Sequence, residues 1–286
     1  MTNNIVILAG GASSRMKKSV DQNLSREKIA QANQLSKGLI ELGGKPFLSY
    51  LLENILKAGF ENVYIITGEN SKIFRQAFEN NPDFKELNIQ FATQYIPEGR
   101  EKPYGTADAL YQCLDQYPNL KEDTFCVCNS DNLYSYKALK TLKDAPTRQA
   151  ILAYDIDKLE YPKERIARFA VMRFDDHYDL TTIVEKPEPS KIDSYTDAHQ
   201  KIRVSMNIFL FDGKLFFKYL ESCPVNPIRD EKELPTALMN MIGDDIDVLG
   251  IPIAEHVPDL TSKNDIAQLE KYFLNNKSSQ PLGKNY

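Results

Sequence analysis

The sequence of 286 residues predicts an α/β fold in which helices cover both faces of a mixed, mostly parallel central sheet. Three observations support this prediction. Short apolar runs alternate with amphipathic helical segments from residue 4 to residue 131, polar motifs follow directly after the apolar runs, and beyond residue 150 the strand-like runs have less helix between them. Ligands of such sheets bind outside the carboxyl ends of the strands, so we expect a site at that edge.

The first half of the chain predicts parallel strands joined by crossover helices. Each expected strand is a short apolar run, and each expected helix repeats apolar residues at three- and four-residue spacing. The strands are expected at 4–9, 63–67, 89–92 and 125–128, and the helices at 47–58, 71–79 and 106–114. This alternation is typical of a doubly wound sheet.

The second half predicts a partly antiparallel extension of the sheet. Strands are expected at 168–174, 180–184 and 203–211, with helices at 213–221 and 232–242. Ser262, followed three residues later by Asp265, resembles a capping box that opens a final helix. The polar tail at 276–286 is expected to fray.

Composition argues against several classes of partner. The net charge is −5 and no run of Lys and Arg forms a basic face, so we expect no nucleic-acid partner. No apolar stretch approaches the roughly 20 residues of a membrane span. The apolar run near the N-terminus is too short for a signal peptide, so we expect a cytoplasmic protein that does not bind membranes.

The cysteines and histidines do not form a metal-binding pattern. No two cysteines have Cys-x-x-Cys spacing, and the histidines are scattered, so we expect buried free thiols, no zinc, and carboxylate ligands for any metal. These residues are Cys113, Cys126, Cys128, Cys223, His177, His199 and His256.

The first expected strand ends in a glycine turn that suits phosphate binding. Gly10 and Gly11 let backbone N–H groups approach an anion, and Arg15 adds a guanidinium fork. Taken alone, two glycines after a strand are also an ordinary tight turn. The polar segment 16–36 follows at once, and it is either a lid over the ligand or a solvated excursion.

Seven motifs then occur in a characteristic order. They are Leu8-Ala9-Gly10-Gly11 with Arg15, Lys37, Gly44-Lys45-Pro46, Gly105-Thr106-Ala107-Asp108-Ala109-Leu110, Asp131-Asn132, Val184-Glu185-Lys186-Pro187 and Asp259-Leu260-Thr261-Ser262. In this order they resemble the sugar-1-phosphate nucleotidylyltransferases, also called NDP-sugar pyrophosphorylases. The resemblance covers about residues 4–275.

The resemblance implies a Rossmann-like (GT-A-type) nucleotidyltransferase fold with a small substrate-binding extension, in a single domain over residues 1–275. Its parts would bind the nucleotide (about 1–150) and the sugar phosphate (about 151–258), and close with a metal-ligand segment and helix (259–275). It also implies two substrates, an NTP and a sugar 1-phosphate, which yield an NDP-sugar and pyrophosphate. The implied cofactor is Mg²⁺, which suits carboxylate ligands completed by substrate phosphates.

The same resemblance assigns roles to individual residues. The catalytic cations are Arg15 and Lys37. The nucleotide-binding residues are Leu8, Ala9, Gly10, Gly11, Ser13, Gln94, Gly105 and Thr106. The residues for the sugar phosphate are Asn132, Glu185, Lys186, Ser205 and Asn207, and the metal ligands are Asp131 and Asp259. Taken alone, Lys37 is equally a solvated lysine before a strand at 38–42, and Asp259 a turn residue.

The sequence departs from the family pattern at two positions where the family usually has glycine, which are Ser13 and Asn207, and no Pro-Leu-Thr follows Arg15. Gly105 favours UTP or dTTP, because family members that use GTP often carry Asn there. The region around Lys37 also resembles the molybdenum-cofactor guanylyltransferases. A cytidylyltransferase for phosphocholine and a catalytically silent regulatory protein are further alternatives. The sequence fixes neither the sugar nor the oligomeric state.

Overall fold

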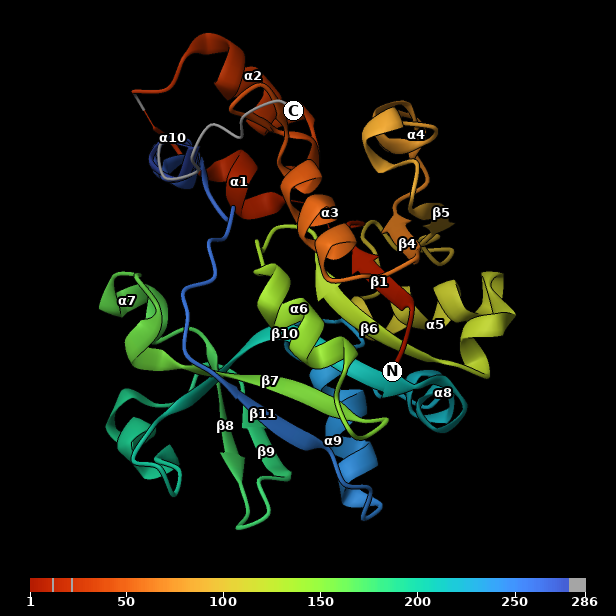
Figure 1. Cartoon of the computed structure of the whole chain (residues 1–286), viewed down its shortest axis with the longest axis vertical. Helices are drawn as coiled ribbons and strands as arrows, with labels where there is room; N and C mark the ends of the chain where they lie inside the picture. The colour runs from red at the N-terminus through yellow and green to blue at the C-terminus, as the bar shows by residue number, and fades with distance from the viewer. Residues whose placement is uncertain (12, 22, 278–286) are drawn as a thin grey trace, which may run out of the picture.

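The computed structural model describes residues 1–11, 13–21 and 23–277. Within them, one sheet of nine strands runs through both halves of the chain (Figure 1). Its strands are β1 (Asn4–Leu8), β4 (Asn62–Thr67), β5 (Asn88–Thr93), β6 (Thr124–Asn129), β7 (Ala150–Asp155), β8 (Ala170–Phe174), β9 (Leu180–Val184), β10 (Arg203–Asp212) and β11 (Leu249–Ile253). The short strands β2 (Glu41–Leu42) and β3 (Lys45–Pro46) pair separately.

The α-helices of the described residues are α1 (Ser14–Lys18), α2 (Arg26–Gln34), α3 (Phe47–Lys57), α4 (Lys72–Phe78), α5 (Thr106–Gln116), α6 (Tyr136–Lys143), α7 (Lys163–Ile166), α8 (Gly213–Glu221), α9 (Leu234–Gly243) and α10 (Lys263–Lys277). Short 3₁₀ helices are η1 (Lys37–Leu39), η2 (Pro82–Phe84), η3 (Pro118–Lys121), η4 (Ile156–Lys158) and η5 (Pro189–Tyr195). The predicted tail 276–286 lies outside the described residues from 278 onward.

The order of the central strands is β11-β7-β10-β6-β1-β4-β5. β1 is parallel to β4 and β6, β4 is parallel to β5, and β11 is parallel to β7. β10 is antiparallel to β6, β7 and β8, and β8 is antiparallel to β9. The predicted fold class is therefore confirmed, with β10 as the strand that joins the parallel half to the extension.

Alternate residues of the strands enter two cores on opposite faces of the sheet. Ile5 and Ile7 pack with α3 and α6 on one face, whereas Val6 packs with α5, α8 and α9 on the other. This is the arrangement that two-sided burial of a parallel sheet requires. All four cysteines are free and buried, as predicted, and burial raises the pKa of the Cys126 and Cys128 thiols.

Several elements of the structure were not predicted from the sequence, among them β7, β11, α6 and α7. β7 is buried along its whole length, and a continuous apolar run gives no period that distinguishes a strand from a helix. β11 contains Gly250 and Pro252, which are rare inside strands, but it lies at the edge of the sheet, where proline is tolerated. α6 lies between β6 and β7, where the sequence predicted no helix.

The strand predicted at 38–42 is only partly present. Residues Lys37–Leu39 form a 3₁₀ turn in which Leu39 N donates to Ser36 O at 2.9 Å, and only Glu41–Leu42 are extended. The 3₁₀ turn fixes the backbone of Lys37 just before β2, which pairs with β3.

The described residues of the segment 16–36 are mostly exposed or half-buried, and two of them anchor it to the core. It contains α1 and α2, and Met16 and Ala32 are fully buried in the core. α1 and α2 lie beside α10 at one end of the molecule (Figure 1). Lys263, which is 4% exposed, donates through Nζ to the carbonyls of Met16, Lys17 and Ser19 at 2.7–3.0 Å.

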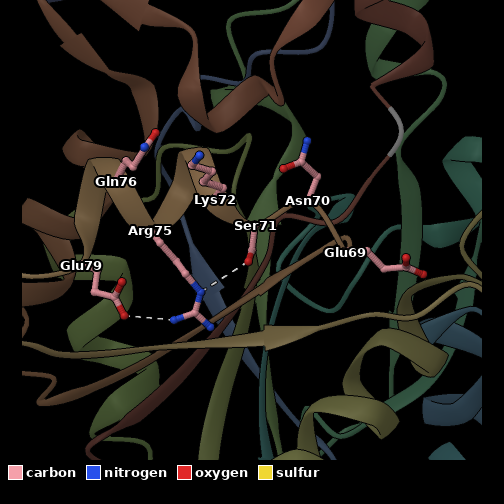
Figure 2. A pocket seen from close by; sticks show the side chains of 7 residues that line it. All are labelled: Glu69, Asn70, Ser71, Lys72, Arg75, Gln76 and Glu79. Atoms are coloured by element: carbon pink, nitrogen blue, oxygen red, sulfur yellow. Dashed lines mark hydrogen bonds and ion pairs between the residues drawn. The ribbon is translucent and has the colours of Figure 1, made fainter.

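Among the described residues, no helix has the length and the apolar character that crossing a membrane requires. A shallow hollow on the surface beside α4 is lined only by residues of the segment 69–79 (Figure 2). Its arginine, Arg75, is already paired with Glu79 at 3.0 Å and donates to Ser71. This hollow follows the carboxyl end of β4, but it shares no lining residue with the hollows described below.

Candidate active site

Two adjoining hollows lie where the polar motifs follow β1 and β6, with volumes of about 570 and 1150 Å³. Their shared walls include Leu8, Arg15, Thr106 and Asp131. The smaller hollow is lined by the predicted nucleotide-binding residues and Lys37, and the larger by the predicted sugar-phosphate residues and Asp259. The structure therefore brings every residue given a catalytic, binding or metal role to the cleft of two adjoining hollows, whereas Gly44-Lys45-Pro46 line neither and Lys45 pairs with Glu53.

The glycine turn leads from β1 into α1. Ser13, the residue before α1, has φ 54°, in the left-handed region that glycine adopts without strain. This explains why the family pattern has glycine at this position. Ser13 adopts the same left-handed conformation, which is strained for a residue with a Cβ atom. Arg15 lies in the first turn of α1 and lines both hollows.

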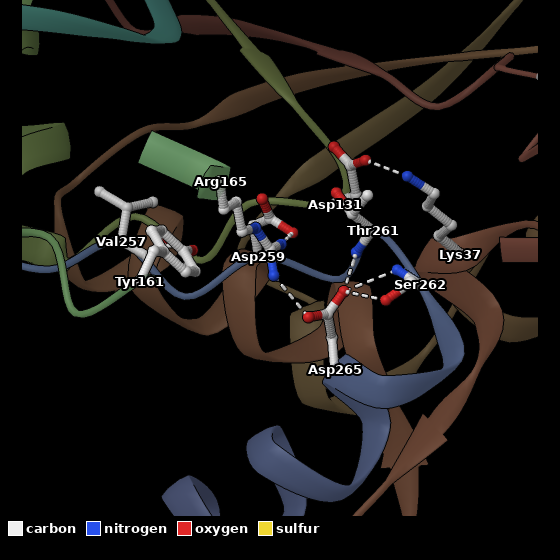
Figure 3. A network of polar contacts seen from close by, with 9 residues as sticks. All are labelled: Lys37, Asp131, Tyr161, Arg165, Val257, Asp259, Thr261, Ser262 and Asp265. Atoms are coloured by element: carbon white, nitrogen blue, oxygen red, sulfur yellow. Dashed lines mark hydrogen bonds and ion pairs between the residues drawn. The ribbon is translucent and has the colours of Figure 1, made fainter. Parts of the chain in front are cut away.

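Lys37 and Asp131 form an ion pair on the boundary between the hollows. Lys37 Nζ lies 2.7 Å from Asp131 Oδ2, and the two side chains are 12% and 25% exposed (Figure 3). Asp131 follows the buried strand β6, and Lys37 comes from the η1 turn. The lysine thus has a protein partner that a phosphate oxygen can replace.

A second ion-pair network lies beside it (Figure 3). Arg165 from α7 pairs with both Asp259 and Asp265, and its guanidinium carbon lies 4.4 Å from the ring centre of Tyr161. Burial raises the pKa of the Asp259 carboxyl, and Arg165 opposes this shift. Arg165 was not found from the sequence, since α7 is four residues long and carries no recognisable motif.

The opening of α10 agrees in part with the predicted capping box. Asp265 Oδ2 accepts the backbone N–H groups of Thr261 at 2.9 Å and Ser262 at 2.6 Å. Ser262 Oγ also donates to Asp265 rather than accepting from the helix backbone. Asp265 therefore fixes the loop that carries Asp259.

The donor set at this point fits Mg²⁺. The backbones of Asn132 and Asp259 form a β-bridge, and Leu260 N donates to Asp131 O at 2.8 Å. The carboxylates of Asp131 and Asp259 therefore come from two segments that lie side by side. Both line the larger hollow. No group of three or more potential ligands occurs among the described residues, and one or two carboxylates completed by phosphate oxygens is a usual magnesium site.

The residues expected to contact the base are Gln94, Gly105 and Thr106, and the last two also pack against the 232–234 segment. Gly105 has φ +100°, and a Cβ atom there would lie 2.3 Å from Lys232 O. Thr106 Oγ1 accepts from Leu234 N at 2.9 Å. Packing against the backbone of the 232–234 segment is enough to explain why position 105 is glycine. Gly105 therefore does not indicate which base the protein binds.

Replacing Gly105 with alanine is expected to destabilise the protein by roughly 2–5 kcal/mol, because it adds a backbone clash to an unfavourable φ. The matched control is Gly243→Ala, where a Cβ meets nothing within 4 Å, and a change below about 1 kcal/mol is expected. Urea denaturation followed by circular dichroism measures both. Equal stability of Gly105→Ala and the wild type would contradict the packing explanation.

The residues expected to bind the sugar phosphate lie just after β9 and in the first half of β10, apart from Asn132. Glu185 Oε2 lies 3.8 Å from a guanidinium nitrogen of Arg229. Burial raises the pKa of the Glu185 carboxyl, and the charge of Arg229 opposes this shift. Asn207 has φ 56° at an irregularity of β10, so the family's glycine position again requires the left-handed region, which Asn tolerates better than most residues. Charged residues that line this part of the cleft but were not predicted from the sequence include Arg168, Arg229 and Glu233.

Comparison with known proteins identifies the family. The family model for nucleotidyl transferases matches residues 4–245. Glucose-1-phosphate adenylyltransferase of Hydrogenovibrio crunogenus is 26% identical over 275 residues (94% of this chain, 61% of that protein), and that of Nitrosomonas europaea is 27% identical over 222 residues (75% and 47%). The chain thus spans less than two thirds of these relatives.

A solved structure, UDP-glucose pyrophosphorylase complexed with UDP-glucose, has the same fold, with a TM-score of 0.71 at 14% identity over 96% of this chain and all of that one. Because the family model covers most of the sequence and the fold agrees, the chain belongs to the nucleotidyl transferase family.

Proposed function

We propose that this protein is a Mg²⁺-dependent nucleotidylyltransferase that joins an NTP to a sugar 1-phosphate. The observation that carries the proposal is the pair of cation–carboxylate contacts, Lys37–Asp131 where the two hollows meet and Arg165–Asp259 in the larger hollow. Two polyanions that meet there would find both cations to stabilise charge and carboxylates to hold a metal.

In the proposed reaction, a phosphate oxygen of the sugar 1-phosphate attacks the α-phosphorus of the NTP. The bond to the bridging oxygen breaks, and pyrophosphate leaves with its electron pair. Mg²⁺, held by Asp131 and Asp259, would neutralise charge on the phosphates. Catalysis then depends on positioning and on preorganised charge.

The residues of the chain divide this work by position. The glycine turn and Arg15 would hold the triphosphate, and Lys37 would exchange Asp131 for an oxygen of the α-phosphate. At the other end, Glu185 would accept hydrogen bonds from sugar hydroxyls, and Lys186 would meet the sugar phosphate. Lys186 has no ion-pair partner among the described residues, so its ammonium is available to an anion.

For the substrates, we propose a hexose 1-phosphate as the acceptor, with glucose 1-phosphate as the first candidate. The names of the two relatives favour ATP as the nucleotide, and that of the solved structure favours UTP. UTP and dTTP were also favoured by the sequence, but the packing of Gly105 against Lys232 removes the basis of that preference.

The test is pyrophosphate release by the purified protein. ATP, CTP, GTP, UTP and dTTP are each combined with the 1-phosphates of glucose, galactose, mannose and N-acetylglucosamine, with Mg²⁺ and with EDTA. We expect release in at least one combination, and its loss with EDTA. Release with phosphocholine alone would indicate the cytidylyltransferase alternative, and nucleotide binding without any release would indicate a silent regulatory protein.

A further inference from the structure

The base end of the cleft contains a carboxamide whose two donors are already used. Gln94 follows β5 and is only 4% exposed. Its Nε2 donates to Gly105 O at 3.0 Å and to Asp108 Oδ2 at 2.9 Å. A primary amide has two N–H donors, so both are paired with protein acceptors.

Asp108 holds this carboxamide in one orientation. It lies in the first turn of α5, where the positive end of the helix dipole favours a carboxylate. The same Oδ2 accepts from Gln112 Nε2 at 2.9 Å, and Gln112 is itself fixed by both backbone groups of Tyr95. A reversed Gln94 amide would direct its oxygen at a carbonyl and a carboxylate, which repel it.

The oxygen of Gln94 is therefore the group that the smaller hollow offers to a ligand. Among the described residues, no donor contacts Gln94 Oε1. A Cβ atom on Gly10 would lie 3.4 Å from this oxygen, so the glycine keeps the approach to it open. Gln94 and Gly10 both line the hollow. An enclosed acceptor that stays unpaired weakens binding, so the ligand must supply a donor.

We propose that Asp108 is a specificity-determining residue that acts through Gln94. By fixing the carboxamide with its oxygen toward the cleft, it makes the site select a base with an N–H donor at that point. The N3–H of uracil or thymine and the 6-amino group of adenine are such donors. The inference rests on the proposed function, in that it takes the smaller hollow as the site of the base.

Binding of nucleotides without sugar phosphate tests this proposal separately from turnover. Two matched pairs are titrated by calorimetry: UTP against 3-methyluridine triphosphate, and ATP against purine riboside triphosphate, which lacks the 6-amino group. In the pair whose parent binds more tightly, loss of the donor is expected to weaken binding roughly 5- to 150-fold. Equal binding of parent and analogue would overturn the inference.

Variants show whether Asp108 is responsible. Asp108→Leu removes the acceptor that fixes the amide, so the ratio of the two dissociation constants is expected to fall toward one. Asp108→Asn can keep an oxygen in the same place and is expected to preserve the ratio. Gln94→Met, which removes Oε1 itself, should also bring the ratio near one.

The matched control is Asp115→Leu, on the same helix, where the carboxylate is 68% exposed and pairs with Lys121. It should keep the wild-type ratio. The inference would be overturned if Asp108→Leu or Gln94→Met kept the wild-type ratio of the two dissociation constants. If neither ATP nor UTP binds, the proposed function fails as well, whereas binding that ignores the donor contradicts only this inference.

Discussion

Lys37→Met is expected to lower the rate of pyrophosphate release by roughly 10²–10³-fold, the effect of removing one preorganised group that stabilises the charge of the transition state. Methionine is unbranched and only one atom shorter than lysine, so it fills most of the same space in a site that is 12% exposed, and the fold should be retained. Binding of the NTP should stay measurable, because Arg15 and the glycine turn are unchanged. Single-turnover kinetics and nucleotide titration measure the two effects separately.

A lysine outside the cleft provides the control for this change. Lys121 pairs with Asp115 at 3.2 Å and lines neither hollow, so Lys121→Met should retain full activity. Unchanged turnover in Lys37→Met would remove Lys37 from the reaction. Loss of nucleotide binding together with turnover would make it a ground-state binding residue instead.

Asp131→Asn is expected to have the largest effect, because Asp131 contacts Lys37 and is one of the two proposed ligands of Mg²⁺. Loss of several kcal/mol of charge stabilisation corresponds to roughly 10²–10⁴-fold in rate. The apparent affinity for Mg²⁺ should fall as well, which titration of activity against Mg²⁺ and paramagnetic Mn²⁺ binding both measure.

The control for this variant is Asp144→Asn at the end of α6. Asp144 pairs with Lys140 and lines neither hollow, so this change should leave the Mg²⁺ dependence as it is. Full activity of Asp131→Asn at ordinary Mg²⁺ concentrations would exclude Asp131 from the metal site.

Local signals were enough to locate the cleft. The strands β1 and β6 are short apolar runs followed at once by glycine or by Asn129-Ser130-Asp131, and parallel strands bring such endings to one edge. Lys37 and Asp259 follow no such strand, and only the order of the family motifs assigned them to the same site before their contacts were known.

Contacts between distant segments could not be predicted in the same way. Arg165 reaches Asp259 and Asp265 across 94 and 100 residues, and nothing in its own surroundings indicates a partner. Gly105 suggested an interpretation in terms of the base, whereas the structure explains it by the backbone of Lys232. Periodicity also fails for β7 and β11, one wholly buried and the other at an edge containing proline.

The contact of Lys263 with α1 links the closing helix to one wall of the cleft. Its ammonium binds the last carbonyls of the helix that carries Arg15, and those carbonyls lie more than 240 residues earlier in the chain. Ser19 closes the same helix locally, since its N–H donates to Arg15 O at 3.0 Å and its Oγ donates to Met16 O at 2.9 Å. The position of α1, and with it that of Arg15, therefore depends on α10 as well as on neighbouring residues. A substitution of Lys263 is expected to disturb a cleft that Lys263 itself does not line.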